Sequence, residues 1–137
     1  MQSQKTVSSL IKTPYWLGIV ADALWAAGLF FPAVFGILTG RTDFNPDLQV
    51  RLIMGIGGTL MTGWTLLLLW AVQRPVERSF ILLLTAFPVV TGMFVIALIG
   101  YLDGNPTNLW LIIKTIVLII SMVTGFFLAQ KERGENS

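Results

Sequence analysis

The sequence predicts an all-α integral membrane protein, a polytopic four-transmembrane-helix up-down antiparallel bundle. Of its 137 residues, 55% are hydrophobic and 12% are charged, whereas a soluble domain carries roughly a quarter of its residues as charges. Four stretches are long and apolar enough to cross about 30 Å of hydrocarbon as helices. The loops between them are short, so consecutive helices should be antiparallel neighbours. We expect a single membrane domain over 1–137.

The predicted spans are 15–38, 52–72, 80–102 and 109–129, with a flexible tail over 130–137. The first span is too long for the apolar core of a signal peptide, so we interpret it as a retained helix. A proline precedes the apolar part of each span. Because proline suits the first helical turn, we expect helices to begin near Pro14, Pro46, Pro75 and either Pro106 or Asn108.

The basic residues predict the topology. Six of them flank the spans on one side of the bilayer, namely Lys5, Lys12, Arg74, Arg78, Lys131 and Arg133, and Arg41 and Arg51 flank them on the other. The positive-inside rule then places both termini in the cytoplasm, with the protein in the cell (plasma or inner) membrane. Tyr15, Trp16, Tyr101 and Trp110 lie at span ends, as in an interfacial aromatic belt.

Composition restricts the chemistry available to this chain. It contains no cysteine and no histidine, which removes the usual zinc, iron–sulfur and haem ligands and the Ser-His and Cys-His nucleophile systems. A net charge of +2 does not indicate nucleic-acid binding. We therefore predict no catalytic residue, no metal ligand, no cofactor and no nucleic-acid partner, and an enzyme is less favoured than a non-enzyme.

Each predicted span has a small or polar side, which usually marks the contact face between helices in lipid. These sides comprise Gly18, Asp22, Ala26, Ala33 and Gly36 in the first span, Gly55, Thr59, Thr62 and Gln73 in the second, Thr85, Pro88 and Gly92 in the third, and Lys114, Ser121 and Gly125 in the fourth. One interpretation is close packing, with each hydroxyl bonded to a carbonyl one turn back. The other is that the polar sides converge on a pocket.

Asp22 is the residue that favours a pocket. Counted from Pro14, it lies about 12 Å below the cytoplasmic face, too deep for its short side chain to reach water. An ionised carboxylate there costs at least about 2.5–3.5 kcal/mol, and such groups are usually functional. The proton- or ligand-binding candidates are Asp22, Lys114, Ser121, Thr62, Thr65 and Thr85. A carbonyl freed by Pro88 would line the same cavity.

Lys114 has two interpretations. It lies about 9 Å from the opposite face by the same count, so its long stem can carry the ammonium group to the interface. Alternatively it pairs with Asp22 across a height difference of roughly 9 Å.

In outline the chain resembles the small multidrug-resistance transporters, through four short helices and a lone acid, Asp22, in the first. That family carries a glutamate where this chain has an aspartate, and its other motifs are not matched here. The resemblance implies a dimer, which the surplus aromatic surface of Trp64 and Trp70 also favours.

Three functions stay open. The first is a small transporter or small-molecule- or proton-binding protein that uses Asp22. The second is a structural or accessory subunit that binds a partner membrane protein through its helix faces. The third, less favoured, is a membrane enzyme that acts on lipid or quinone. The partners expected in addition to the lipid bilayer are therefore a second copy of the chain or another membrane protein.

Overall fold

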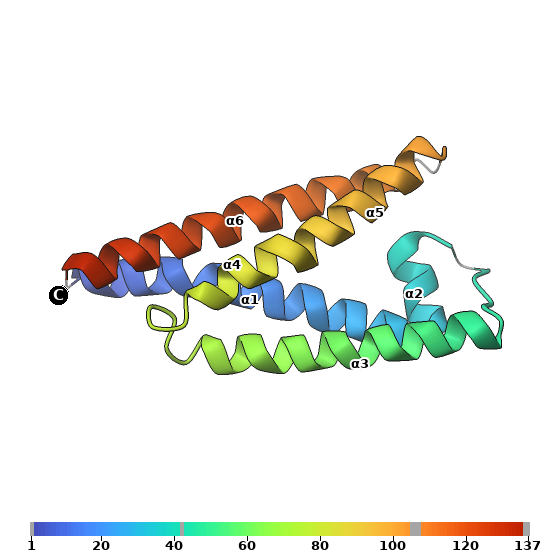
Figure 1. The fold of residues 1–137 in the computed structure, drawn as a ribbon, viewed down its shortest axis with the longest axis horizontal. Coiled ribbons are helices and arrows are strands. Elements are labelled where there is room, and N and C mark those ends of the chain that lie inside the picture. Colours follow the sequence, from blue (N-terminus) through green and yellow to red (C-terminus); the bar gives the residue numbers. More distant parts are fainter. Residues whose placement is uncertain (1, 42, 105–107, 136–137) are drawn as a thin grey trace. The chain divides into compact units, whose positions relative to one another are not determined.

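The computed structural model describes residues 2–41, 43–104 and 108–135, and every regular element in these ranges is a helix (Figure 1). The elements are α1 (Gln2–Phe30), α2 (Pro32–Thr39), α3 (Leu48–Ala71), α4 (Phe80–Leu84), the π-helix η1 (Thr85–Val90), α5 (Thr91–Leu102) and α6 (Asn108–Glu135). Within the described residues, three stretches are long and apolar enough to cross a membrane, Leu48–Ala71, Phe80–Leu102 and Asn108–Gly134. The all-α class is thus confirmed, with three helices of membrane-spanning length and composition.

The helix boundaries agree with the expected spans to different degrees. The range 80–102 coincides with Phe80–Leu102. At the start of α3, the Asp47 carboxylate accepts the Val50 amide N–H at 2.8 Å, so Asp47 caps this helix. Pro14 lies inside α1 instead of at its start, and α6 begins at Asn108. Pro106 lies outside the described residues, as do the last two residues of the expected tail.

The expected first span, 15–38, is divided into two helices. Phe31 has extended backbone angles (φ −119°, ψ 101°), and Pro32 begins the short helix α2. Pro32 has no N–H to continue the hydrogen bonds of α1, so the chain turns at this point. The apolar residues 32–38 therefore belong to α2, which explains why α1 is not among the three membrane-spanning stretches.

The chain forms two compact units. The central unit is Ile19–Leu67 and contains the second half of α1, all of α2 and most of α3. The terminal unit combines Met1–Gly18 with Leu68–Ser137, and therefore includes both chain ends.

Glycines and aromatic rings pack the central unit. A Cβ on Gly58 would lie 3.2 Å from the Phe30 ring, so glycine permits the close approach of α1 and α3. The Phe35 ring of α2 contacts Trp25 of α1 edge-on, with ring centroids 6.0 Å apart. Gly40 ends α2 in the left-handed conformation (φ 72°) and returns its N–H to α2 carbonyls.

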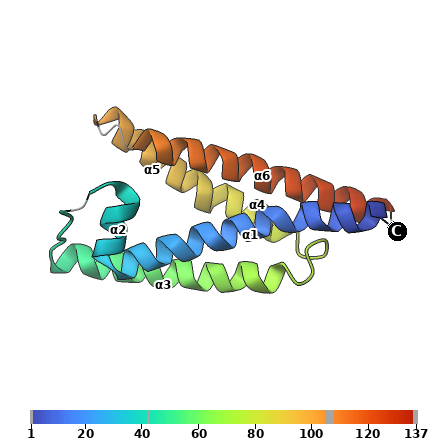
Figure 2. The ribbon, with the colours of Figure 1, turned by 180° about the vertical axis from the view of Figure 1, so that it is seen from behind.

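In the terminal unit, α6 runs alongside α4 and α5 in both views (Figures 1 and 2). The first half of α1 also packs on α6, because a Cβ on Gly125 would lie 2.5 Å from the Pro14 ring. Gly18 has similarly close neighbours in Met122 and Leu68. These contacts place the beginning of α1 against the second half of α6.

Candidate functional site

Asp22 lies on the buried side of α1. Its side chain is 4% exposed, and Ile19 and Ala26, three residues before it and four after it, are also buried. Val20 and Leu24, which point the other way, are about half exposed. The small, polar side expected for this segment therefore faces inward as far as Phe30, where α1 ends.

The carboxylate of Asp22 is incompletely satisfied. Its Oδ2 atom is buried and accepts no hydrogen bond from any described residue. Buried polar atoms in proteins nearly always have a partner, and an unpaired buried charge is far more costly than an unpaired neutral group. The geometry therefore provides a carboxyl group that a proton or a cation would neutralise.

Thr62 and Thr65 lie in the central unit with Asp22, but neither is hydrogen-bonded to it in the described chain. The Thr62 hydroxyl donates to the Gly58 carbonyl, and the Thr65 hydroxyl donates to the Met61 carbonyl, each at 2.8 Å. Both therefore make the bond one turn back that the packing interpretation expects. Thr62 is also exposed, whereas Thr65 is partly buried.

The buried side of α3 differs from the side expected. Thr59 and Thr62 are exposed and Gly55 is only partly buried, whereas the buried positions are Met54, Gly58, Leu68 and Ala71. Gln73, which is also exposed, lies beyond the end of α3. The expected stripe is defined by its small and polar side chains. Because each threonine satisfies its hydroxyl on its own helix, a threonine can face outward without an unpaired polar group.

Thr85 is fully buried in the terminal unit, where its hydroxyl donates to the Ile81 carbonyl at 2.8 Å. It lies at the start of η1, in which Phe87 has non-helical backbone angles and Pro88 follows. Thr91 bridges this break, because its hydroxyl and its amide N–H both donate to the Ala86 carbonyl. The helix break expected at Pro88 is therefore present, but Thr91 donates two hydrogen bonds to the Ala86 carbonyl within it. Pro88 itself is exposed.

Lys114 is exposed on α6, and its Nζ lies 5.3 Å from the centre of the Trp110 ring. This is a cation–π distance. Trp110 lies one turn closer to the start of α6, so the ammonium group is directed toward the end of the helix. This orientation favours the interfacial interpretation of Lys114. Asp22 belongs to the other unit, and the pairing of the two residues stays a prediction.

Ser121 lines an open groove between α1 and α6 within the terminal unit. The groove encloses about 240 Å³, and its other lining residues are Leu10, Thr13, Pro14, Thr124, Gly125 and Leu128. Most of this lining is apolar, and Asp22 is not part of it. Of the six candidate residues, Asp22, Thr62 and Thr65 belong to the central unit, and Thr85, Lys114 and Ser121 belong to the terminal unit.

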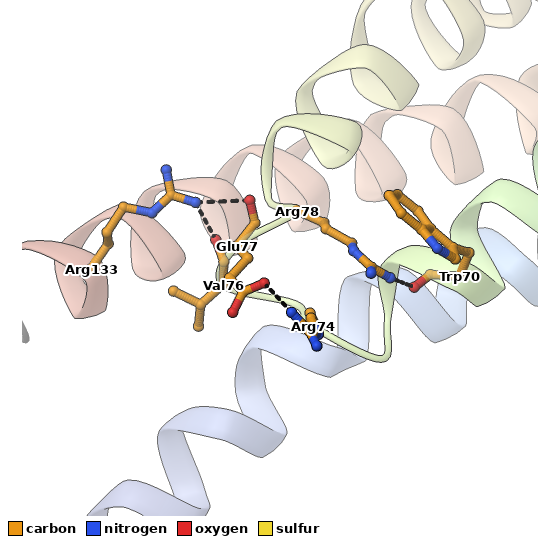
Figure 3. Close-up of polar contacts among 6 residues, drawn as sticks. All are labelled: Trp70, Arg74, Val76, Glu77, Arg78 and Arg133. Carbon is orange, nitrogen blue, oxygen red and sulfur yellow. Dashed lines mark hydrogen bonds and ion pairs between the residues drawn. The ribbon is translucent and has the colours of Figure 1, made fainter.

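Sequence reasoning missed a polar cluster around the α3–α4 loop, residues 72–79, in the terminal unit. Arg133 of α6 donates from one nitrogen, Nη2, to the Val76 and Glu77 carbonyls at 2.9 and 2.8 Å (Figure 3). The Arg78 guanidinium group lies 3.4 Å from the centre of the Trp70 ring and donates to the Trp70 carbonyl. In the sequence, both arginines indicate only the topology.

Tyr15 of α1 holds the same loop from a third helix. Its side chain is fully buried, and its hydroxyl oxygen lies 3.0 Å from both the Pro75 and the Arg78 carbonyl oxygens. The hydroxyl has one proton, so it donates to one carbonyl at a time. No local pattern signals this contact, because the partners are about sixty residues apart in the sequence.

In the described ranges no three Asp, Glu, His or Cys side chains lie close enough together to hold a metal ion. The comparisons with known proteins add no assignment to this geometry, since no protein-family model, no curated protein and no solved structure matches the chain.

Proposed function

We propose that this chain is a small multi-pass membrane protein that binds a proton or a small cation at Asp22, as part of transport or of small-molecule binding. The observation that carries the proposal is the buried carboxylate whose Oδ2 lacks a hydrogen-bond partner among the described residues. A purely structural acid at such a place would be expected to have its oxygens paired. A carboxyl group that gains and loses a proton or a cation has an oxygen that no other group of the protein occupies.

The chemistry of the site favours small hard cations and protons. A single carboxylate oxygen is a good acceptor for either, and the hydroxyls of Thr62 and Thr65 are already bonded to their own helix. An ionised Asp22 in a hydrocarbon layer would cost about 2.5–3.5 kcal/mol or more. Neutralisation of the carboxylate therefore releases free energy that can drive a change of state.

The proposal includes a fourth span and an orientation. We propose that α1, with α2 at its end, supplies the fourth crossing of an up-down bundle, with both termini cytoplasmic. Support comes from the six-to-two distribution of basic residues. It also comes from the length of α1, whose 29 residues extend about 43 Å at 1.5 Å per residue.

The accessory-subunit and lipid- or quinone-enzyme hypotheses have no observation in their favour. Large apolar side chains are exposed on every long helix, which lipid contact alone accounts for. The dimer also stays a prediction. One face of the Trp70 ring is covered by Arg78, which weakens the argument from surplus aromatic surface.

The test is infrared spectroscopy of the purified protein in nanodiscs. A protonated carboxylic acid has a carbonyl stretch that an ionised carboxylate lacks. We expect a carboxylic-acid band that titrates with bulk pH, disappears in Asp22→Asn and persists in the matched variant Asp103→Asn, whose side chain is exposed. Addition of Na⁺ should diminish the band if the site takes a metal cation.

Two outcomes would refute the proposal. One is a band that is unchanged in Asp22→Asn. The other is an Asp22 carboxylate that responds neither to pH nor to Na⁺ and so behaves as a fixed structural group.

A further inference from the structure

The position of the α3–α4 loop relative to the bilayer follows from its neighbours in the sequence. It joins Leu48–Ala71 to Phe80–Leu102, two helices long and apolar enough to span a membrane. A connection of eight residues between two such helices must lie at a membrane–water interface, at the level of the lipid headgroups. Trp70, two residues before the loop, is half exposed, as is common for tryptophan at this depth.

The loop turns its hydrogen-bond acceptors toward the protein. The carbonyl oxygens of Pro75 and Arg78 lie against the Tyr15 hydroxyl, and those of Val76 and Glu77 accept from Arg133. Four consecutive carbonyl dipoles are therefore directed at helices of the terminal unit. This orientation reduces the repulsion that an anion would meet at the loop.

Two arginines of the loop are close neighbours. The Arg78 amide N–H donates to the Arg74 carbonyl at 3.0 Å, which closes one helical turn, and side chains four residues apart share one side of such a turn. Arg78 is held in place by stacking on Trp70 (Figure 3). Arg74 is 64% exposed, and its Nη1 lies 3.2 Å from the Glu77 carboxylate.

We propose that Arg74 and Arg78 bind the phosphodiester headgroup of an anionic phospholipid. A guanidinium group offers paired N–H donors that match phosphate oxygens, and its affinity for anions survives stacking on an aromatic ring. Glu77 competes with the headgroup for Arg74 in this site. The exposed Arg74–Glu77 pair contributes little stability by itself, so a phosphate group can displace Glu77 at low cost.

The experiment is native mass spectrometry of the full chain with phosphatidylglycerol and with phosphatidylcholine. Arg74→Gln should weaken phosphatidylglycerol binding about fivefold, as expected for one basic residue at an anionic surface, and should leave phosphatidylcholine binding unchanged. Glu77→Gln should strengthen phosphatidylglycerol binding, because it removes the competing carboxylate. Excess inorganic phosphate should not displace the lipid, because the acyl chains of the lipid also bind the apolar helix surfaces and free phosphate has none.

Arg51→Gln is the matched control, since it removes one exposed positive charge from the beginning of α3. It should change phosphatidylglycerol binding less than Arg74→Gln does. If the two substitutions weaken phosphatidylglycerol binding equally, the lipid is attracted by diffuse positive charge, and the proposed site is overturned. The site is also overturned if Arg74→Gln and Glu77→Gln shift binding in the same direction, or if inorganic phosphate displaces the lipid.

Discussion

At the scale of single residues, Tyr15 joins two parts of the chain that lie about sixty residues apart in the sequence. Its place at the beginning of an apolar run indicates a ring in the interfacial aromatic belt. In the structure the ring is fully buried and the hydroxyl contacts two loop carbonyls. The sequence gives the depth of a tyrosine in a membrane helix, but not which neighbour its hydroxyl reaches.

Tyr15→Phe should destabilise the folded protein by about 1–3 kcal/mol, because it removes the one buried hydroxyl donor that the Pro75 and Arg78 carbonyls share. The measurement is the free energy of unfolding in mixed micelles. Tyr101→Phe is the control, since Tyr101 is 42% exposed near the end of α5, and it should have little effect. Equal stability losses in the two variants would show that the Tyr15 hydroxyl does not hold the loop.

A double-mutant cycle on Asp22 and Lys114 decides between the two interpretations of the lysine. Lys114 is exposed and stacked near Trp110, so Lys114→Met alone should change the free energy of unfolding by only about 0.5 kcal/mol. We expect the effects of Asp22→Asn and Lys114→Met to add. A coupling energy of about 1 kcal/mol or more would instead establish a pair.

At the scale of helices, the apolar run 80–102 was predicted with its observed bounds, whereas the run 15–38 is divided at Pro32. Pro32 and Pro88 both lie inside expected spans, yet Pro32 ends α1 while Pro88 sits in a π-helix between α4 and α5. Proline is tolerated inside membrane helices when neighbouring groups satisfy the backbone. At Pro88 the Thr91 hydroxyl contributes to that. Whether a proline ends a helix or is accommodated within it depends on these neighbouring groups. A hydropathy pattern does not identify them.

Close packing of α1 on α6 gives a prediction at the same scale. Gly125→Ala should destabilise the protein by about 1–3 kcal/mol, because the new methyl group would meet the rigid Pro14 ring. Gly63→Ala is the matched control, since a Cβ there has no neighbour within 4 Å in the described structure, and it should be neutral or slightly stabilising. Thermal unfolding in detergent measures both. A Gly125→Ala protein as stable as Gly63→Ala would contradict this packing.

At the scale of the whole molecule, the all-helical class and three spanning stretches could be predicted from hydropathy alone, because backbone polar groups in lipid must be satisfied within each helix. The candidate site could be predicted only in part. The depth of Asp22 in its expected span identified it as a candidate. Its burial could be predicted because it depends only on the face of one helix. Whether the six candidate residues converge stays a prediction, because convergence depends on packing between helices, and similar small residues occur on several faces of each helix.

The topology prediction belongs to this scale. A reporter fused after the last residue should give a cytoplasmic signal, and one inserted between Arg41 and Asp47 should give the opposite signal, as expected from the basic-residue bias. A cytoplasmic signal from the insertion would reverse the proposed fourth crossing. Equal mixtures at both sites would indicate that the chain inserts in both orientations.

The contact between Arg133 and the α3–α4 loop has a consequence for biosynthesis. Val76 and Glu77 leave the ribosome 57 and 56 residues before the arginine that binds their carbonyls. Until the end of α6 is made, the loop lacks one of the side chains that hold it. A nascent chain stopped just before residue 133 could have every helix in the membrane and still be an incomplete protein. Such a chain would be distinguished from the finished one by protease access at residues 72–79.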